Sequence, residues 1–283
     1  MSADRIAADE ETRARWRQAA DAWERRQAEV RETTAPVAAW MVGAIDPQPG
    51  QRLLELAAGP GETGFIAAAR VQPGGTLLST DQSEEMVAVA RRRAQELGLN
   101  NVEFAVVDAQ LLELEPERFD GVLCRFGYML MGDPDAALAR THRVLRPGGR
   151  LAMAVWDAPQ ENLWMAAPAM QLIAAGAMER PDPAGAGPFS MADRSKLEGD
   201  LARAGFSDVR TDPIRFKQEY ESFDQYWEIT LELAAPVAEA LAGLDATGIA
   251  KVRDAIRGML AQFELDGGRL SIPAIAVGAS GRA

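Results

Sequence analysis

The chain has 283 residues, of which 47% are hydrophobic and 25% are charged, a composition typical of an ordinary soluble globular protein. Its 42 acidic residues outnumber its 30 basic residues, and the net charge of -12 would repel a nucleic-acid backbone. No apolar run approaches the ~18 residues that a membrane helix needs. We therefore expect a small-molecule substrate, with no nucleic acid and no membrane as partner.

The chain contains one cysteine, Cys124, and one histidine, His142. These counts exclude internal disulfides, multi-thiolate metal sites and two-histidine zinc sites, so we expect no metal. The first thirty residues mix Arg with Asp and Glu and lack the apolar stretch of a signal peptide. Together these features predict a cytoplasmic protein.

The N-terminal region has helical periodicity. Apolar and small residues from Trp16 to Val30 recur on one face. The Thr-Ala-Pro sequence at 34–36 indicates a new helix start, and the second helix continues to about Ala44. Residues 1–48 are therefore predicted to form an N-terminal helical lid.

From residue 49 onward, short apolar runs alternate with helical periods, a pattern that indicates repeated βαβ units and a parallel sheet. The predicted strands span 52–56, 76–80, 102–107, 120–124 and 150–156. A partly helical excursion follows at 158–190, then a helix at 191–204 and a strand at 208–220. Residues 49–221 thus form the predicted core.

The rest of the chain is predicted to return to the sheet after an interruption. Two amphipathic helices within 222–265 form a helical insert on the substrate side. Residues 266–283 supply the last strand, at 270–277, and a tail.

The most informative segment is L-L-E-L-A-A-G-P-G-E-T-G at 53–64, where an apolar strand runs into a glycine-rich turn and a helix. Gly59 and Gly61 allow a sharp turn and a close approach to a ligand, and the helix start offers unpaired N–H groups. By itself this pattern is shared by dinucleotide-binding folds.

Three predicted strands in succession end in acids. Glu55 lies near the end of the first strand, and Asp81 and Asp108 end the next two. The carboxyl ends of parallel strands meet at one edge of the sheet, where ligands bind in open α/β folds. An ammonium, a ribose diol and an exocyclic amine would satisfy the three acids in turn. S-adenosylmethionine has those groups, whereas NAD has no ammonium.

Five ordered segments now resemble the motifs of class I S-adenosylmethionine-dependent methyltransferases, and more narrowly the ubiquinone/menaquinone-biosynthesis type (methyltransferase type 11) and its small-molecule relatives. They are ELAAGPGETG, TDQSEEMV, VVDA, FDGVLCRFGYMLM and HRVLRPGGRLAMAVW, all within residues 50–157. The resemblance implies a Rossmann-like, doubly wound seven-stranded sheet of order 3-2-1-4-5-7-6 with strand 7 antiparallel. One departure is Glu62, which stands where such loops often have a third glycine.

The resemblance also implies cofactor-binding roles, with S-adenosyl-L-homocysteine as the product. The methionine moiety would be held by Glu55, Ala57, Gly59 and Gly61, the adenosine by Asp81, Gln82, Met86, Asp108 and Ala109, and the sulfonium side by Cys124 and Arg125.

Methyl transfer from a sulfonium is an in-line displacement that depends chiefly on orientation in a dry pocket. Aromatic residues and methionines near the predicted cleft could line that pocket, and each could equally be plain core. The candidates are Trp23, Phe126, Tyr128, Met131, Trp156 and Trp164. An apolar pocket of this kind fits a hydrophobic or aromatic metabolite. The resemblance implies that this metabolite is quinone-like or of the polyketide type and is methylated on oxygen or carbon.

The catalytic groups remain open at this point. Tyr128 and His142 are weak candidates for a general base, and an acidic acceptor that binds ionised would need none. A protein of this fold that performs cyclisation or decarboxylation, or that only binds ligand, is an alternative. Glu55 and Asp108 disfavour a nicotinamide-dependent oxidoreductase. The sequence leaves open whether the protein forms a homodimer.

Overall fold

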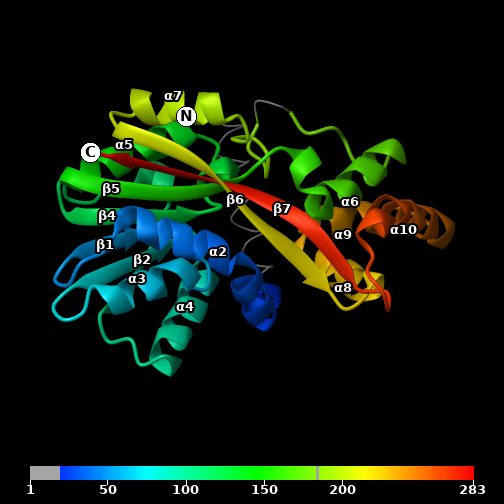
Figure 1. Ribbon diagram of the computed structural model, residues 1–283, viewed down its shortest axis with the longest axis horizontal. Helices are drawn as coiled ribbons and strands as arrows, with labels where there is room; N and C mark the ends of the chain where they lie inside the picture. Colours follow the sequence, from blue (N-terminus) through cyan, green and yellow to red (C-terminus); the bar gives the residue numbers. More distant parts are fainter. Residues whose placement is uncertain (1–19, 183–184) are drawn as a thin grey trace.

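The computed structural model describes residues 20–182 and 185–283. Seven strands form one sheet of order β3-β2-β1-β4-β5-β7-β6 (Figure 1). The strands are β1 Arg52–Glu55, β2 Thr76–Asp81, β3 Val102–Val106, β4 Phe119–Arg125, β5 Leu145–Trp156, β6 Ser207–Tyr220 and β7 Leu270–Arg282. The first five pair in parallel, and β7 is antiparallel to both of its neighbours. The predicted fold class is confirmed.

Helices cover both faces of this sheet (Figure 1). One layer contains α2 Gln27–Ile45, α3 Glu62–Arg70 and α4 Glu84–Glu96, and the other contains α5 Pro134–Val144 and α7 Arg194–Arg203. Strands covered on both faces need apolar side chains on both, which explains the continuous apolar runs of β4 and β5. Short 3-10 helices follow at η1 Ala109–Leu111, η2 Tyr128–Leu130, η3 Pro159–Glu161 and η4 Ala261–Phe263.

The last strand is longer than the sequence predicts. It continues past Val277 to Arg282, pairing with β5 as far as Arg150. The small residues after Val277 resemble a tail in the sequence. In the structure Gly278 packs against the Trp40 ring, because a Cβ added at this position would lie only 2.6 Å from the nearest ring atom.

The predicted helix start at 34–36 is wrong. The helix breaks at Arg26 instead, and α2 runs without interruption through Pro36. Pro36 has no N–H to donate to the carbonyl of Glu32, four residues earlier. That carbonyl lies on an exposed turn, where water can bind it.

The lid assignment is also wrong for α2. Val37, Met41 and Val42 are fully buried in the main core, so this helix is a layer of the fold. Trp16 and the rest of residues 1–19 lie outside the described residues.

The insert contains three α-helices where two are predicted: α8 Phe223–Leu233, α9 Ala235–Ala242 and α10 Ala246–Leu260. Pro236 occupies the first turn of α9, and this separates α9 from α8. With α6 Leu163–Ala174, these helices gather at the end of the molecule where β6 and β7 extend beyond the sheet (Figure 1). They enclose a second core around Tyr226, Ile256 and Leu260.

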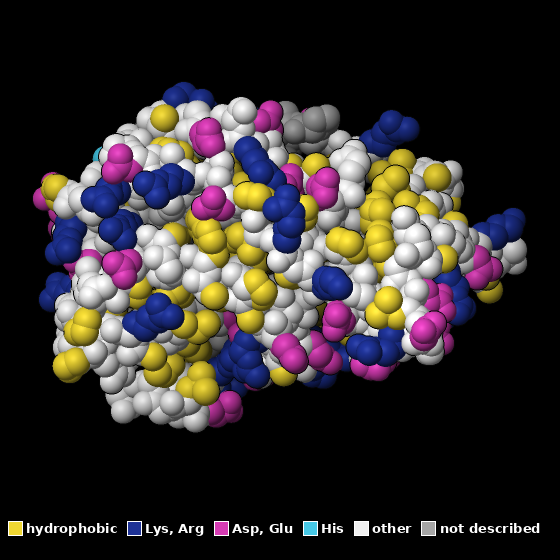
Figure 2. Space-filling model, viewed as in Figure 1, with side chains coloured by type: hydrophobic (Ala, Val, Ile, Leu, Met, Phe, Trp, Pro, Cys, Tyr) yellow, Lys and Arg dark blue, Asp and Glu magenta, His cyan; other side chains and the backbone are white. Residues whose placement is uncertain are grey.

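The surface carries acidic and basic side chains interspersed with each other (Figure 2). None of the described helices is long and apolar enough to cross a membrane.

Asn162 joins the end of β5 to β7. It is fully buried, its Oδ1 accepts the Ile275 N–H at 3.0 Å, and its Nδ2 donates to the Ile275 carbonyl at 2.9 Å. Asn162→Ala should lower the free energy of unfolding by about 2 kcal/mol, because the Ile275 N–H is left buried without an acceptor. Urea unfolding measures this, and the exposed control Gln160→Ala should change it by less than about 0.5 kcal/mol. Equal effects would contradict the role of Asn162.

Candidate functional site

The site is organised at the end of β1, where Glu55 is buried against the start of α3. Its Oε1 accepts the Gly64 N–H at 2.7 Å. A Cβ on Gly64 would lie 2.1 Å from Oε2, so only glycine leaves room for this carboxylate. Glu55 therefore fixes the position of the helix that follows the glycine loop.

The glycine loop has an unusual backbone conformation. Ala57 (φ 49), Gly59 (φ 53) and Gly61 (φ 85) all adopt the left-handed region. Gly127, after β4, packs close by, since an added Cβ would lie 2.7 Å from both the Ala57 Cβ and the Cys124 Sγ. The loop thus lies directly against the end of β4.

Asp81 ends β2 and is hydrogen-bonded on both oxygens. Oδ2 accepts the Gly59 N–H and Oδ1 accepts the Ser83 N–H, both at 2.9 Å. Ser83 in turn caps α4 by accepting the Met86 N–H. Asp81 therefore couples the glycine loop to the start of α4, where Met86 is buried and Gln82 is partly exposed.

The third acid follows the end of β3. The Val107 N–H donates to the Asp81 carbonyl at 2.9 Å, so Asp108 lies one residue beyond the pairing with β2. Its carboxylate accepts the Gln110 N–H at 2.9 Å and caps η1, and Ala109 is buried. The structure thus brings the three acids to one edge, as the sequence predicts.

A network of charged side chains surrounds the loop. Arg125, at the end of β4, donates a hydrogen bond to Thr34 of α2 and interacts electrostatically with Glu55 and Glu62. Glu62, the residue that replaces the third glycine, forms a buried ion pair with Arg93 of α4. The sequence alone does not predict this pairing, because the partners come from different helices.

Several polar atoms in this network have no protein partner. Glu55 Oε2, Glu62 Oε2 and Thr63 Oγ1 are buried and make no hydrogen bond. Buried acceptors without donors are costly, so the loop is suited to a ligand that supplies donor groups.

Burial also shifts the acids toward their neutral forms. It raises the pKa of Glu55 to about 7 and raises the pKa of Asp81, with backbone hydrogen bonds opposing both changes. A cationic ligand would favour the ionised forms. The residues present therefore fit a methionine moiety and its ammonium group.

Cys124 is a core residue. It is fully buried, and burial raises the pKa of its thiol to about 12, so it stays protonated. It contributes to the site through the close packing of its sulfur beneath Gly127.

Four aromatic rings gather where the core meets the insert. Phe126 stacks on Trp156 with centroids 3.9 Å apart, and Trp164 meets Trp156 edge-on at 5.2 Å. Phe126 has a φ of 59°, a strained conformation for an aromatic residue that this packing holds in place. Phe216 of β6 completes the cluster at 6.0 Å from Trp156. Phe216 is not among the pocket residues predicted from the sequence, although its place in an extended apolar-polar run could have indicated it.

The remaining predicted pocket residues differ in position. Met131 is partly buried, with its Cε 3.7 Å from where a Cβ on Gly127 would lie, so it is beside the loop. Trp23 is partly buried in the helical segment before α2.

Neither candidate base is placed to act. Tyr128 is fully buried, and its hydroxyl is 2.7 Å from the Thr141 hydroxyl; burial raises its pKa well above the ordinary value. His142 packs edge-on against Phe206 at 5.1 Å. Phe206 precedes β6 at the amino edge of the sheet, opposite the glycine loop. Packing holds both side chains, Tyr128 beside Thr141 and His142 beside Phe206.

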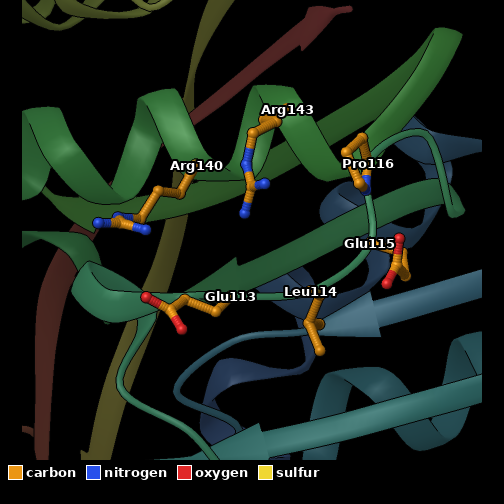
Figure 3. A pocket seen from close by; sticks show the side chains of 6 residues that line it. All are labelled: Glu113, Leu114, Glu115, Pro116, Arg140 and Arg143. Carbon is orange, nitrogen blue, oxygen red and sulfur yellow. The ribbon is translucent and has the colours of Figure 1, made fainter.

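A separate hollow of about 370 Å³ lies between α5 and the segment before β4 (Figure 3). Its lining includes Glu113, Glu115, Arg140 and Arg143. None of these belongs to the glycine loop or its acids, so this hollow is distinct from the candidate site.

Comparison with known proteins finds related methyltransferases. A family model described as a methyltransferase domain matches residues 47–181. The chain is 33% identical over 220 residues to nocamycin O-methyltransferase of Saccharothrix syringae, covering 74% of this chain and 72% of that one. It is 37% identical over 117 residues to the ubiquinone/menaquinone biosynthesis C-methyltransferase of Teredinibacter turnerae, covering 41% of this chain and 47% of that one. The latter match thus spans less than half of its relative.

The fold is similar to the crystal structure of the YcgJ protein from Bacillus subtilis. The TM-score is 0.58 at 19% identity, covering 87% of this chain and 97% of that one. At this identity the likeness supports the fold alone.

Asp81→Ala should weaken binding of S-adenosylmethionine by about 1 to 3 kcal/mol, because it removes the acceptor predicted to bind the ribose hydroxyls and also loosens Gly59. Titration calorimetry measures the change. A matched control is Asp120→Ala, which removes an acid that accepts the Arg52 N–H at 2.6 Å at the amino edge. Unchanged affinity in the Asp81 variant would refute the ribose assignment.

Glu55 should give the unliganded protein a distinctive pH dependence. Its folded pKa is raised from 4.5 to about 7, so the folded state holds the proton more tightly than the unfolded state. The resulting stabilisation, about 3 kcal/mol, is present below pH 4.5 and is lost as the pH rises through about 7. Glu55→Gln should remove this part of the pH dependence of urea unfolding.

The exposed residue Glu103 supplies the control for this experiment, since Glu103→Gln should leave the pH profile unchanged. A Glu55→Gln profile identical to that of the unmodified protein would show that Glu55 does not titrate near pH 7.

Proposed function

The chain belongs to the class I S-adenosylmethionine-dependent methyltransferases, and we propose that it transfers the methyl group of this cofactor to a small hydrophobic or aromatic metabolite. The observation that carries this proposal is the glycine loop with buried, unpartnered acceptors beside it. The O-methyltransferase relative, which matches most of the chain, supports a small acceptor.

Different residues of the site would bind different parts of the cofactor. The backbone of Ala57, Gly59 and Gly61 would lie along the methionine moiety, next to Glu55. Asp81 would hold the ribose hydroxyls, with Gln82 and Met86 beside the adenosine. Asp108 and Ala109 would meet the adenine, and Cys124 and Arg125 would flank the sulfonium side. When bound, the cofactor supplies an electrophilic methyl group on a positively charged sulfur.

The chain's own contribution is to orient the acceptor and exclude water. The rings of Phe126, Trp156, Trp164 and Phe216 form one packed wall between the end of the sheet and the insert. Aromatic rings favour planar acceptors that can pack against them, and orientation alone contributes effective molarities of about 10⁵ M or more. We therefore assign the acceptor to this side of the site.

Neither of the two candidate bases is placed to take a proton from the acceptor. Among the candidate bases in the described part of the chain, Tyr128 is locked in the core and His142 is at the opposite edge. The acceptor would then lose its proton through its own acidity, as a phenol or an enol does. Such anions react through oxygen or through the activated carbon, which fits both kinds of relative.

The test is formation of S-adenosylhomocysteine with a panel of acidic phenols and enolised diketones, set against primary amines and aliphatic alcohols. Product with a phenol or enol supports the proposal. Cofactor binding without product across the panel would favour the alternative, a protein of this fold with a different reaction. The predicted cytoplasmic location and the homodimer stay predictions.

Trp156→Ala should raise the KM for such an acceptor about tenfold or more, since it removes the central ring of the wall. The Kd of S-adenosylmethionine, measured by calorimetry, should stay within about twofold of the unmodified value. Trp227→Ala is the control, because Trp227 stacks on Phe223 within the insert. Equal effects on acceptor KM and cofactor Kd would contradict a separate acceptor wall.

A further inference from the structure

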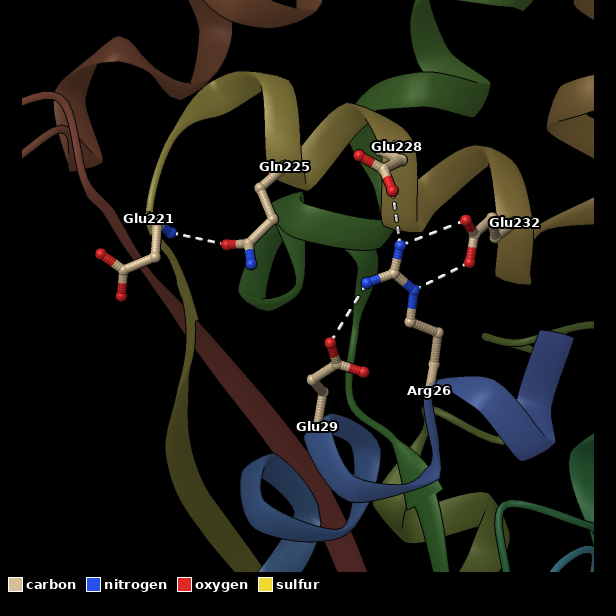
Figure 4. A network of polar contacts seen from close by, with 6 residues as sticks. All are labelled: Arg26, Glu29, Glu221, Gln225, Glu228 and Glu232. Carbon is tan, nitrogen blue, oxygen red and sulfur yellow. Dashed lines mark hydrogen bonds and ion pairs between the residues drawn. The ribbon is translucent and has the colours of Figure 1, made fainter.

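The short helical segment before α2, residues 20–26, is bound by ion pairs to two distant parts of the chain. Glu24 binds Arg92 of α4, with both carboxylate oxygens within 2.9 Å of Nη2. Two residues later, Arg26 binds Glu228 and Glu232 of α8 (Figure 4). We call this segment the strap.

The contacts of Arg26 are the stronger of the two. Its Nε and Nη2 donate to the two oxygens of Glu232 at 2.8 and 3.1 Å, a bidentate pair, and Nη2 also donates to Glu228 at 2.7 Å. Nη1 donates to Glu29 on its own helix. The Arg26 side chain is 17% exposed, whereas Arg92 is 54% exposed. Arg26 lowers the pKa of Glu232, which agrees with a persistent pair.

The ion pairs of the strap join two helices that pack at opposite ends of the sheet. Helix α4 packs on β2 and β3, and α8 packs on β6, at the other end of the sheet. Between them in the sheet order lie β1, β4, β5 and β7. Farther along the same helical stretch, Thr34 bonds Arg125 at the end of β4. The strap therefore reaches from the cofactor side of the site to the insert.

We propose that the strap holds bound ligand at the carboxyl edge and that Arg26 is the positioning residue that sets how fast the ligand leaves. This inference rests on the cofactor site proposed above and does not depend on methyl transfer. For a ligand to leave, the segment must separate from α8, and this breaks the contacts of Arg26 with Glu228 and Glu232.

The experiment measures dissociation of S-adenosylhomocysteine from the full chain by stopped-flow tryptophan fluorescence. This probe is suitable because its ammonium and carboxylate charges cancel, so salt acts on it only weakly. Raising the salt from about 0.01 M to about 0.5 M should speed dissociation from the unmodified protein, because salt screens the part of the contact that solvent reaches, at the 64% exposed Glu228 side chain. Arg26→Gln and Glu232→Gln should each speed dissociation about threefold to tenfold at low salt and remove most of the salt dependence.

Glu29→Gln is the matched control. It removes a carboxylate from the same guanidinium, but one that does not reach α8, so the dissociation rate should match that of the unmodified protein. If Arg26→Gln folds poorly, Glu232→Gln and the salt series on the unmodified protein test the same contact.

The proposal is overturned if S-adenosylhomocysteine binds and the Arg26→Gln and Glu232→Gln rates equal the unmodified rate, even if the melting temperature falls. That result would assign Arg26 to stability alone. Failure of the unmodified protein to bind the probe would instead refute the cofactor site. Hydrogen exchange over residues 20–34 then tests the strap itself: faster exchange in Arg26→Gln supports it, and unchanged exchange overturns it.

Discussion

Two buried carboxylates that accept backbone N–H groups determine the shape of the site. Glu55 receives the Gly64 N–H and Asp81 receives the Gly59 N–H, so the glycine loop is tied to two neighbouring strands. Among the four oxygens of these two acids, Glu55 Oε2 alone has no hydrogen bond. A buried acid is costly unless donors reach its oxygens. Here those donors are the free N–H groups that a tight turn and a helix start provide, and the constraint fixes the loop before any ligand arrives.

The rest of the architecture places an acceptor side next to this loop. The ribbon of β6 and β7 continues beyond the sheet and carries the insert, so a second core forms outside the carboxyl edge. The aromatic wall lies at the junction of the two cores, with Trp156 of β5 in contact with rings from β4, β6 and α6. Cofactor and acceptor would thus meet where strand ends and insert converge.

The charges at the loop favour a cationic ligand. Glu55, Glu62 and Asp81 face two guanidinium groups, from Arg93 and Arg125, so the cluster carries an excess of acid when all groups are ionised. Burial raises the pKa of Glu55 and Asp81 and partly relieves this excess in the unliganded protein. An ammonium and a sulfonium would relieve it without protonation.

The sequence by itself determined the glycine loop and the meeting of three acids at one edge, because turn glycines, apolar strands and strand-end acids are local features that parallel pairing brings together. The strand order was predicted only through the resemblance of the motifs to a known family, and the structure confirms it. The sequence did not determine which residues each side chain contacts in the folded protein. The sequence predicted α2 as part of a lid, although Val37 and Met41 lie in the core. It also left Tyr128 and His142 as candidate bases, whereas in the structure Tyr128 is hydrogen-bonded to Thr141 and His142 packs against Phe206. Only the tertiary structure could bring Arg26 to Glu232, 206 residues away, because such a pair has no local signal in the chain.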